Sequence, residues 1–269
     1  MKECVWAIYF SPTGGTKKAA FYLAESLGKE VKEVDLSAPD FNGAEFKKDD
    51  LVIVAAPAFG GRIPALMAER LKCTAGKGAA AVTAAVYGNR AYEDALVELN
   101  DALEEQGFEP FASVAVLAEH SMVREVAAGR PDAKDHEELS GFGAQILKKL
   151  EAAEITRPQV PGNRPYKEWK KMPAVPVNGS GCTGCGLCAG LCPSGAISKE
   201  NPSVTDPEKC ILCLRCIAVC PSGAKKLPER VQEMLNQKLL PLKGIRKENE
   251  LFSGKHRTRG IIFRIGSNT

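Results

Sequence analysis

Eight of the ten cysteines lie between Cys182 and Cys220, while residues 1–178 contain only Cys4 and Cys73. A disulfide-stabilised secreted chain would not leave its large domain nearly free of cysteine, so this crowding favours metal binding in a reducing compartment. The crowded segment is an internal repeat, because every Cys in it and the Pro after each fourth Cys recur at an offset of 28 residues. The repeat predicts two pseudo-symmetric halves.

Each copy of the repeat reads C-x₂-C-x₂-C-x₃-C-P, which resembles the bacterial ferredoxin run. The first copy contains Cys182, Cys185, Cys188, Cys192 and Pro193, and the second contains Cys210, Cys213, Cys216, Cys220 and Pro221. The cross-ligation known for this run assigns one [4Fe–4S] cluster to Cys182, Cys185, Cys188 and Cys220, and another to Cys192, Cys210, Cys213 and Cys216. Two zinc sites are the alternative, although structural zinc normally joins Cys pairs separated by a longer loop.

The first 155 residues alternate between apolar runs of strand length and amphipathic helical patterns. We expect strands at Val5–Phe10, Val31–Leu36, Leu51–Ala56, Ala79–Val86 and Phe111–Ala118, with helices at about residues 19–27, 64–72, 92–106 and 132–153. This pattern predicts an α/β fold with a doubly wound parallel five-stranded sheet in the order 2-1-3-4-5.

Composition divides the chain into four parts. We expect an N-terminal domain at residues 1–155, a Pro-rich basic linker at 156–177, a small α+β ferredoxin domain at 178–226 and a basic C-terminal tail at 227–269. The five prolines of the linker predict an ordered or semi-rigid connection, and Arg230–Leu240 in the tail is a candidate helix.

Charge is distributed unevenly along the chain. The N-terminal domain has 17 basic and 25 acidic residues, while the linker has 5 and 1, so the formal total of +3 hides an acidic domain beside basic segments. Two oxidised clusters with their thiolates would add about −2 each, which removes most of the case for a nucleic-acid partner. No apolar run reaches the roughly 18 residues of a membrane span, so we expect a cytoplasmic protein.

The segment Ser11-Pro12-Thr13-Gly14-Gly15-Thr16 joins the first strand to the first helix. Hydroxyls and backbone amides at a helix N-terminus form an uncharged cradle for a phosphate. The segment is not a Walker loop because the GK[ST] ending is missing. An ordinary capped turn uses the same residue types and is the alternative interpretation.

This segment resembles the flavodoxin loop [ST]-x-T-G-x-T, and the whole chain resembles the bacterial flavodoxin–ferredoxin fusions known as EFR-type ferredoxins. Further similar segments are Gly60–Pro64, Tyr87–Arg90, Glu119–His120 and Arg164–Lys171. The resemblance implies a flavodoxin-like fold and FMN, with its phosphate on Ser11, Thr13, Gly14, Gly15 and Thr16. It also implies flavin-ring contacts from Pro57, Ala58, Phe59, Gly60, Gly61, Tyr87, Gly88, Asn89, Tyr92, Glu119 and His120.

Some of these residues have ordinary structural interpretations as well. Phe59 and Tyr87, and more weakly Tyr92, are candidates to stack on the ring or to pack locally. Arg62 and Arg90 are candidates to face a phosphate or a reduced flavin, or to be solvated. His120 is a candidate to hydrogen-bond flavin or substrate, or to be a structural histidine at a strand end.

These features predict an electron-transfer protein that passes electrons between FMN, two [4Fe–4S] clusters and an external redox partner protein. Three alternatives stay open at this point. They are a flavin-dependent reductase of an organic substrate with the clusters as relay, a non-catalytic redox sensor, and a flavin-free ferredoxin with a relic domain.

Overall fold

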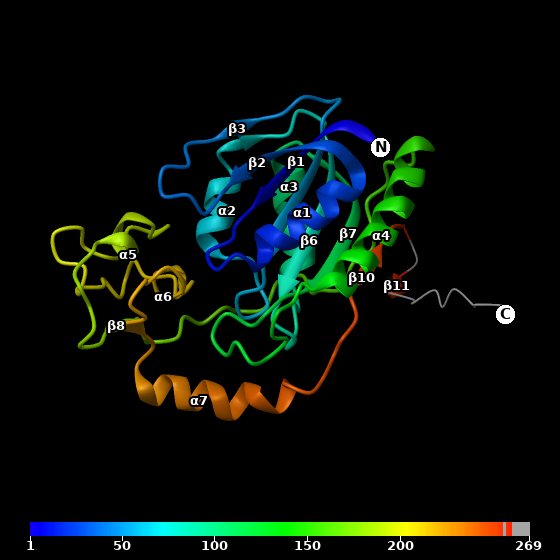
Figure 1. The fold of residues 1–269 in the computed structure, drawn as a ribbon. Helices are drawn as coiled ribbons and strands as arrows, with labels where there is room; N and C mark the ends of the chain where they lie inside the picture. Colours follow the sequence, from blue (N-terminus) through cyan, green and yellow to red (C-terminus); the bar gives the residue numbers. More distant parts are fainter. Residues whose placement is uncertain (255–256, 260–269) are drawn as a thin grey trace.

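A seven-stranded sheet forms the centre of the computed structural model, which describes residues 1–254 and the backbone of residues 257–259 (Figure 1). Its strand order is β11-β10-β7-β6-β4-β1-β2. The strands of this sheet are β1 (Lys2–Tyr9), β2 (Gly28–Asp35), β4 (Leu51–Pro57), β6 (Ala80–Tyr87), β7 (Glu109–Leu117), β10 (Glu250–Phe252) and β11 (Arg257–Arg259).

The first five of these strands are parallel and follow the predicted order 2-1-3-4-5. Residues 51–56 of β4 are all buried, as expected for a central strand that is covered on both faces. At the edge of the sheet, β2 alternates Val with Lys and Glu and stays partly exposed. The predicted strand boundaries agree with the observed ones to within three residues.

Helices cover both faces of the sheet. One face packs against α1 (Gly15–Leu27) and α4 (Ala133–Glu151), and the other packs against α2 (Ala65–Leu71) and α3 (Ala95–Glu105) (Figure 1). All four correspond to predicted helices. The two-residue strands β3 (Ala44–Glu45) and β5 (Thr74–Ala75) form a separate small pair.

The C-terminal segment returns to the sheet, which the sequence analysis did not predict. After α7 (Glu229–Leu239), close to the predicted helix, and a 3₁₀ turn η1 (Leu240–Leu242), the chain adds β10 antiparallel to β7. Two strands therefore extend the predicted five-stranded sheet, and the predicted tail contributes α7, η1, β10 and β11 to the fold. Residues 255–256 and 260–269 of that tail lie outside the described residues.

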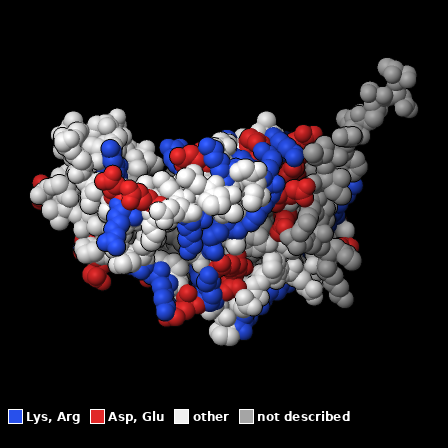
Figure 2. Space-filling view, turned by 90° about the horizontal axis from the view of Figure 1, so that it is seen from below, with Lys and Arg blue, Asp and Glu red and all other residues white. Residues whose placement is uncertain are grey.

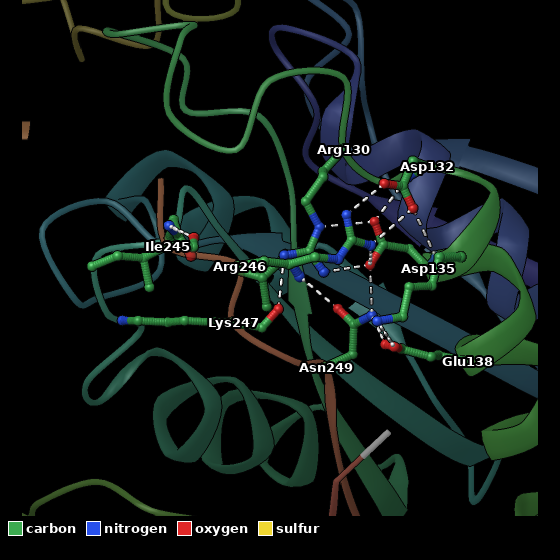
Figure 3. Close-up of polar contacts among 11 residues, drawn as sticks. Arg130, Asp132, Asp135, Glu138, Ile245, Arg246, Lys247 and Asn249 are labelled. Carbon is green, nitrogen blue, oxygen red and sulfur yellow. Dashed lines mark hydrogen bonds and ion pairs between the residues drawn. The ribbon is translucent and has the colours of Figure 1, made fainter. Parts of the chain in front are cut away.

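A buried polar network holds this returning segment (Figure 3). The Arg130 guanidinium donates to the Asp135 carboxylate and to the Lys247 carbonyl. The Asn249 side chain accepts from the Leu117 N–H at 2.8 Å and donates to Asp135 at 2.9 Å. Because Asp135 and Asn249 are fully buried and cannot bond to water, each depends on these hydrogen bonds to satisfy its polar atoms.

The cysteine module, residues 178–226, folds as two similar halves. The first half contains α5 (Leu187–Gly190) and the second contains α6 (Arg215–Ala218), while β8 (Val177–Asn178) pairs with β9 (Lys225–Lys226) at its ends. Left-handed backbone recurs at the offset of 28 residues, in the pairs Gly184 and Leu212, Gly186 and Leu214, and Gly195 and Gly223. For a leucine this conformation costs about 1–2 kcal/mol, so the shape of the repeat overrides the local preference.

The linker, residues 156–177, is ordered along the surface of the N-terminal domain. The buried Asp94 carboxylate accepts from the backbone N–H groups of Asn163 and Lys167 at 2.8 and 2.7 Å. Asp101 accepts from the guanidiniums of Arg157 and Arg164. Two acidic residues of α3 and its N-cap therefore fix the basic linker in place.

Within the part of the chain that is described, no helix combines the length and apolar character needed to cross a bilayer.

Candidate functional site

A cavity of about 450 Å³ lies at the carboxyl ends of the parallel strands, where open α/β sheets bind their ligands. This volume is within the range of small-molecule and cofactor sites. The loops after β1, β4, β6 and β7 form one side of the cavity, and the linker, the cysteine module and α7 form the other. In Figure 1, α7 runs below the ends of the strands.

The loop after β1 contributes Pro12, Thr13, Gly15 and Thr16 to the cavity wall. It leads directly into the 13-residue helix α1, so the positive end of that helix faces the cavity. Of the predicted phosphate contacts, Ser11 and Gly14 do not line the cavity. The Ser11 hydroxyl is buried and accepts from the Lys17 N–H at 2.9 Å, which fixes the shape of the loop.

The loop after β4 contributes Pro57, Ala58, Phe59 and Gly60. It ends in a tight turn in which Phe59 and Arg62 exchange backbone hydrogen bonds and both Gly60 and Gly61 have positive φ. Gly61 is turned toward Glu93 and does not line the cavity. Arg62 pairs with Glu98 at 2.6 Å and donates to the Lys167 carbonyl, so its role here is to hold the turn against the linker.

The loop after β6 contributes Tyr87, Gly88 and Arg90, but not Asn89 or Tyr92. The buried Asn89 side chain instead donates to the carbonyls of Leu242 and Ile245 and anchors the C-terminal segment. The Tyr92 hydroxyl donates to Glu250, and its ring packs edge-on against Tyr87 at 5.1 Å. These two predicted flavin contacts therefore support the cavity wall from behind.

The loop after β7 contributes Glu119 and His120. The His120 Nδ1 accepts from the Met122 N–H at 3.2 Å, so a neutral ring carries its proton on Nε2. Burial and the neighbouring Arg90 lower the pKa of His120, which favours this neutral form. Burial would raise the pKa of Glu119, but hydrogen bonds from the Gly129 N–H and Arg124 lower it. The Glu119 carboxylate therefore stays ionised, and both of its oxygens accept hydrogen bonds within the protein.

Three segments of the cavity wall were not predicted: residues 167–172 of the linker, residues 211–213 of the cysteine module, and Leu235, Lys238 and Leu239 of α7. Trp169 is 41% exposed, and its ring lies so close to Gly60 that a Cβ there would approach it to 3.1 Å. Lysines from the linker and α7 give this wall a positive charge. In Figure 2, Lys and Arg gather in the middle of the face seen from below.

The structure brings the eight clustered cysteines together in two sets. The first cysteine set, Cys182, Cys185, Cys188 and Cys220, lines one small cavity. In the second cysteine set, Cys192, Cys210, Cys213 and Cys216, burial and then the neighbouring thiols of the set raise the pKa of Cys216 to about 12. Each set contains the last cysteine of the opposite copy, which is the grouping expected from cross-ligation.

Hydrogen-bond donors already surround several of these sulfurs. The Ala196 N–H donates to the Cys192 sulfur at 3.3 Å, and the Asn178 amide donates to the Cys182 sulfur at 3.0 Å. The Lys225 N–H and the Ser222 hydroxyl lower the pKa of Cys220 to about 7. Such donors favour the thiolate form at Cys220, whereas burial favours the neutral thiol at Cys216, so the buried second set would depend on a positively charged iron–sulfur core to hold its cysteines as thiolates.

All ten cysteines of the chain are free of disulfide bonds. Within the described residues, no three His, Cys, Asp or Glu side chains are grouped as ligands of a single metal ion. In a [4Fe–4S] cluster, by contrast, four thiolates hold one iron–sulfide core.

A doubly wound sheet with a cavity at its carboxyl edge, joined to a cysteine module with two sets of four thiols, defines a flavodoxin–ferredoxin fusion. The family model described as flavodoxin matches residues 8–156, more than half of the chain, and the chain therefore belongs to the flavodoxin family. A second model, described as a 4Fe-4S dicluster domain, matches residues 181–224. This match favours iron–sulfur over the zinc alternative.

Solved structures to which the chain is similar include the rubredoxin oxygen:oxidoreductase of Desulfovibrio gigas, at 23% identity and a TM-score of 0.40. That match covers 58% of this chain and only 38% of the other protein. A Streptococcus pneumoniae flavodoxin matches at 21% identity and a TM-score of 0.38, over 54% of this chain and 99% of its own. Flavodoxin 1 of Bacillus cereus matches at 18% identity and a TM-score of 0.37, over 55% and 98%.

The search of curated proteins found no match. A flavodoxin domain implies FMN and a dicluster ferredoxin domain implies 4Fe–4S clusters, so the chain combines two cofactor types of electron-transfer proteins.

Proposed function

We propose that this chain binds FMN in the 450 Å³ cavity and two [4Fe–4S] clusters on the two cysteine sets, and that it passes electrons between them and an external redox protein. The observation that carries this proposal is the shared cavity wall. Residues 211–213 of the cysteine module and the loops of the N-terminal domain line the same cavity. A cofactor in that cavity would therefore contact the segment that contains the ligand Cys213.

The residues around the cavity have complementary roles in this proposal. The amides and hydroxyls of Thr13, Gly15 and Thr16 would bind the phosphate at the N-terminus of α1. Phe59 and Trp169 would flank the flavin ring and exclude water. Bound FMN supplies the ability to exchange two electrons as a pair or singly, while each cluster exchanges one.

The test is the cofactor content of protein purified without oxygen. We expect about eight irons, matching sulfide and one FMN per chain. Cys188→Ala should lower the iron to about four per chain, while Cys73→Ser, which changes an exposed cysteine outside both sets, should leave it unchanged. Iron without flavin, or zinc in place of iron, would overturn the proposal.

A second candidate is a flavin-dependent reductase of an organic substrate. The observation in its favour is the set of cations on the cavity wall, where Lys238, together with Arg90 and Lys167, which share the Glu93 carboxylate, would attract an anionic compound. Two measurements separate the candidates. Once reduced by a light pulse, an electron carrier would pass its electrons to cytochrome c at a rate that depends on the clusters, whereas a reductase would pass them to an added organic acceptor.

A further inference from the structure

The two copies of the cysteine repeat differ at matched positions. Gly184 and Gly186 of the first copy correspond to Leu212 and Leu214 of the second, and all four residues have positive φ. Glycine is the residue expected at such positions, so the two leucines need another reason. Both are buried, at 6% and 3% exposure, in one apolar cluster with Val123 and Val126 of the N-terminal domain. The leucines therefore pack the second copy against the N-terminal domain.

A polar contact strengthens the same side of the module. Arg215, which directly precedes Cys216, donates to the carbonyl of Ser11 at 3.1 Å, to the carbonyl of Pro12 at 3.3 Å and to Ser37. Its counterpart in the first copy is Leu187, which is 42% exposed. The residue that fixes the second copy to the phosphate loop thus has no equivalent in the first.

The crossing cysteine of the second set lies on the same side. Arg70 of α2 donates to the Pro193 carbonyl at 2.8 Å, next to Cys192, and also to the Leu36 carbonyl. Both chain segments that contribute to the second set therefore contact the N-terminal domain. Residues 211–213 go further and form part of the cavity wall itself.

The first cysteine set has the opposite surroundings. Cys182 and Cys185 are exposed, whereas Cys210, Cys213 and Cys216 are buried. Leu187, between Cys185 and Cys188, is an exposed apolar side chain, and so is Val177, which precedes Asn178, the donor to the Cys182 sulfur. A cluster on the first set would be open to a large partner that cannot enter the flavin cavity.

We infer that the second cysteine set holds the proximal cluster, which exchanges electrons with the flavin, and that the first set holds the distal cluster, which exchanges them with the external redox protein. This inference rests on the proposed function. One two-electron change at the flavin is balanced by two successive one-electron exchanges at each cluster and by two one-electron partner molecules. The flavin's protons are exchanged with water.

Hydrogen–deuterium exchange provides a test that does not depend on activity. In the holoprotein with intact clusters, removal of FMN should speed amide exchange in residues 210–216 and leave residues 182–188 unchanged. The two peptides occupy matched positions in the repeat, so each serves as the control of the other. Equal responses, or a response confined to residues 182–188, would overturn the inference.

A matched pair of variants tests which cluster exchanges electrons with the flavin. Arg215→Ala should slow electron exchange between flavin and clusters after a light pulse by about tenfold. The reason is that it removes the hydrogen bonds that hold the segment with the proximal cluster against the N-terminal domain. Leu187→Ala should leave that rate unchanged and instead alter the reaction with cytochrome c, the probe acceptor. The reverse pattern would show that the first set is proximal.

The cofactor assays keep this inference separate from the proposed function. If a variant lacks iron or FMN, the exchange experiment on the unmodified protein still decides the order of the clusters. If the unmodified protein itself lacks FMN or clusters, the proposed function fails. If both cofactors are present and the exchange pattern is reversed, only the order of the clusters is wrong.

Discussion

Replacing Asn249 tests whether the returning C-terminal segment stabilises the fold. Asn249 is fully buried, and Asn249→Ala removes the acceptor of the Leu117 N–H and donors to Asp135 and Glu138. An orphaned buried N–H alone costs about 1–3 kcal/mol, and the weakened carboxylates add to this, so we expect a loss of about 3 kcal/mol. The urea dependence for a chain of this size is about 3 kcal/mol per molar, so the unfolding midpoint should fall by about 1 M.

The control for this variant is Arg246→Ala, which lies in the same network but at its surface. Arg246 is 40% exposed and pairs with Asp132, itself 38% exposed, at 2.7 Å, and more distantly with the buried Asp135, at 3.6 Å. Solvent screens such a pair, so its loss should cost at most about 1 kcal/mol. Urea titrations of both variants, at equal saturating FMN and followed by circular dichroism, make the comparison. Equal midpoints for the two variants would refute the reasoning.

Three further predictions concern the cavity and its supports. Burial lowers the pKa of His120 below its ordinary 6.5, so the contribution of His120 to stability is present above about pH 6.5 and declines as the pH falls. His120→Asn, which keeps an acceptor for the Met122 N–H, should flatten the pH dependence of the thermal midpoint, and an unchanged slope would count against this. Trp169→Ala should weaken FMN binding about two- to tenfold in a fluorescence titration. The control is Trp6→Phe, because Trp6 is not part of the cavity wall, and equal affinities would exclude the stacking role. Asp101→Asn should expose the linker to limited proteolysis, because the ionised Asp101 carboxylate holds the linker in place. Burial would raise the pKa of Asp101, but hydrogen bonds from Arg164, Tyr166 and Arg157 lower it to about 2. Asp49→Asn is the control, and equal cleavage of the two variants would contradict the prediction.

The central sheet could be predicted because its signals are local and strong. The apolar runs of β4, β6 and β7 have strand length, and right-handed crossovers leave few orders for five parallel strands. The cysteine repeat was equally direct, since its spacing survives in the backbone as matched left-handed residues. Each of these features is visible within a short window of sequence.

The missed features depend on distant parts of the chain. The strand β10 has only three residues, Glu250–Phe252, and becomes a strand because the exposed edge of β7 is available to pair with it. Residues 167–172 have a basic, exposed composition that gives no sign of a cavity wall. Their position is set by hydrogen bonds from the linker to Asp94 and Asp101, which lie far from the linker in the sequence.

Contacts with a distant part of the chain also explain why two predicted flavin contacts do not line the cavity. Asn89 and Tyr92 follow β6 as flavin-contacting loop residues would, but the C-terminal segment provides partners for both. Only the returning chain, which sequence patterns did not place, could have shown this.

The cysteine module is attached to the N-terminal domain at both of its ends, by the linker before it and by α7 and β10 after it. A segment closed at both ends samples a much smaller volume than one joined by a single flexible tether, and its local concentration at the opposite surface is set by geometry. In the proposed function, electron transfer between FMN and the clusters would therefore be independent of protein concentration. Transfer to a separate partner would be bimolecular, so dilution would slow only that second step.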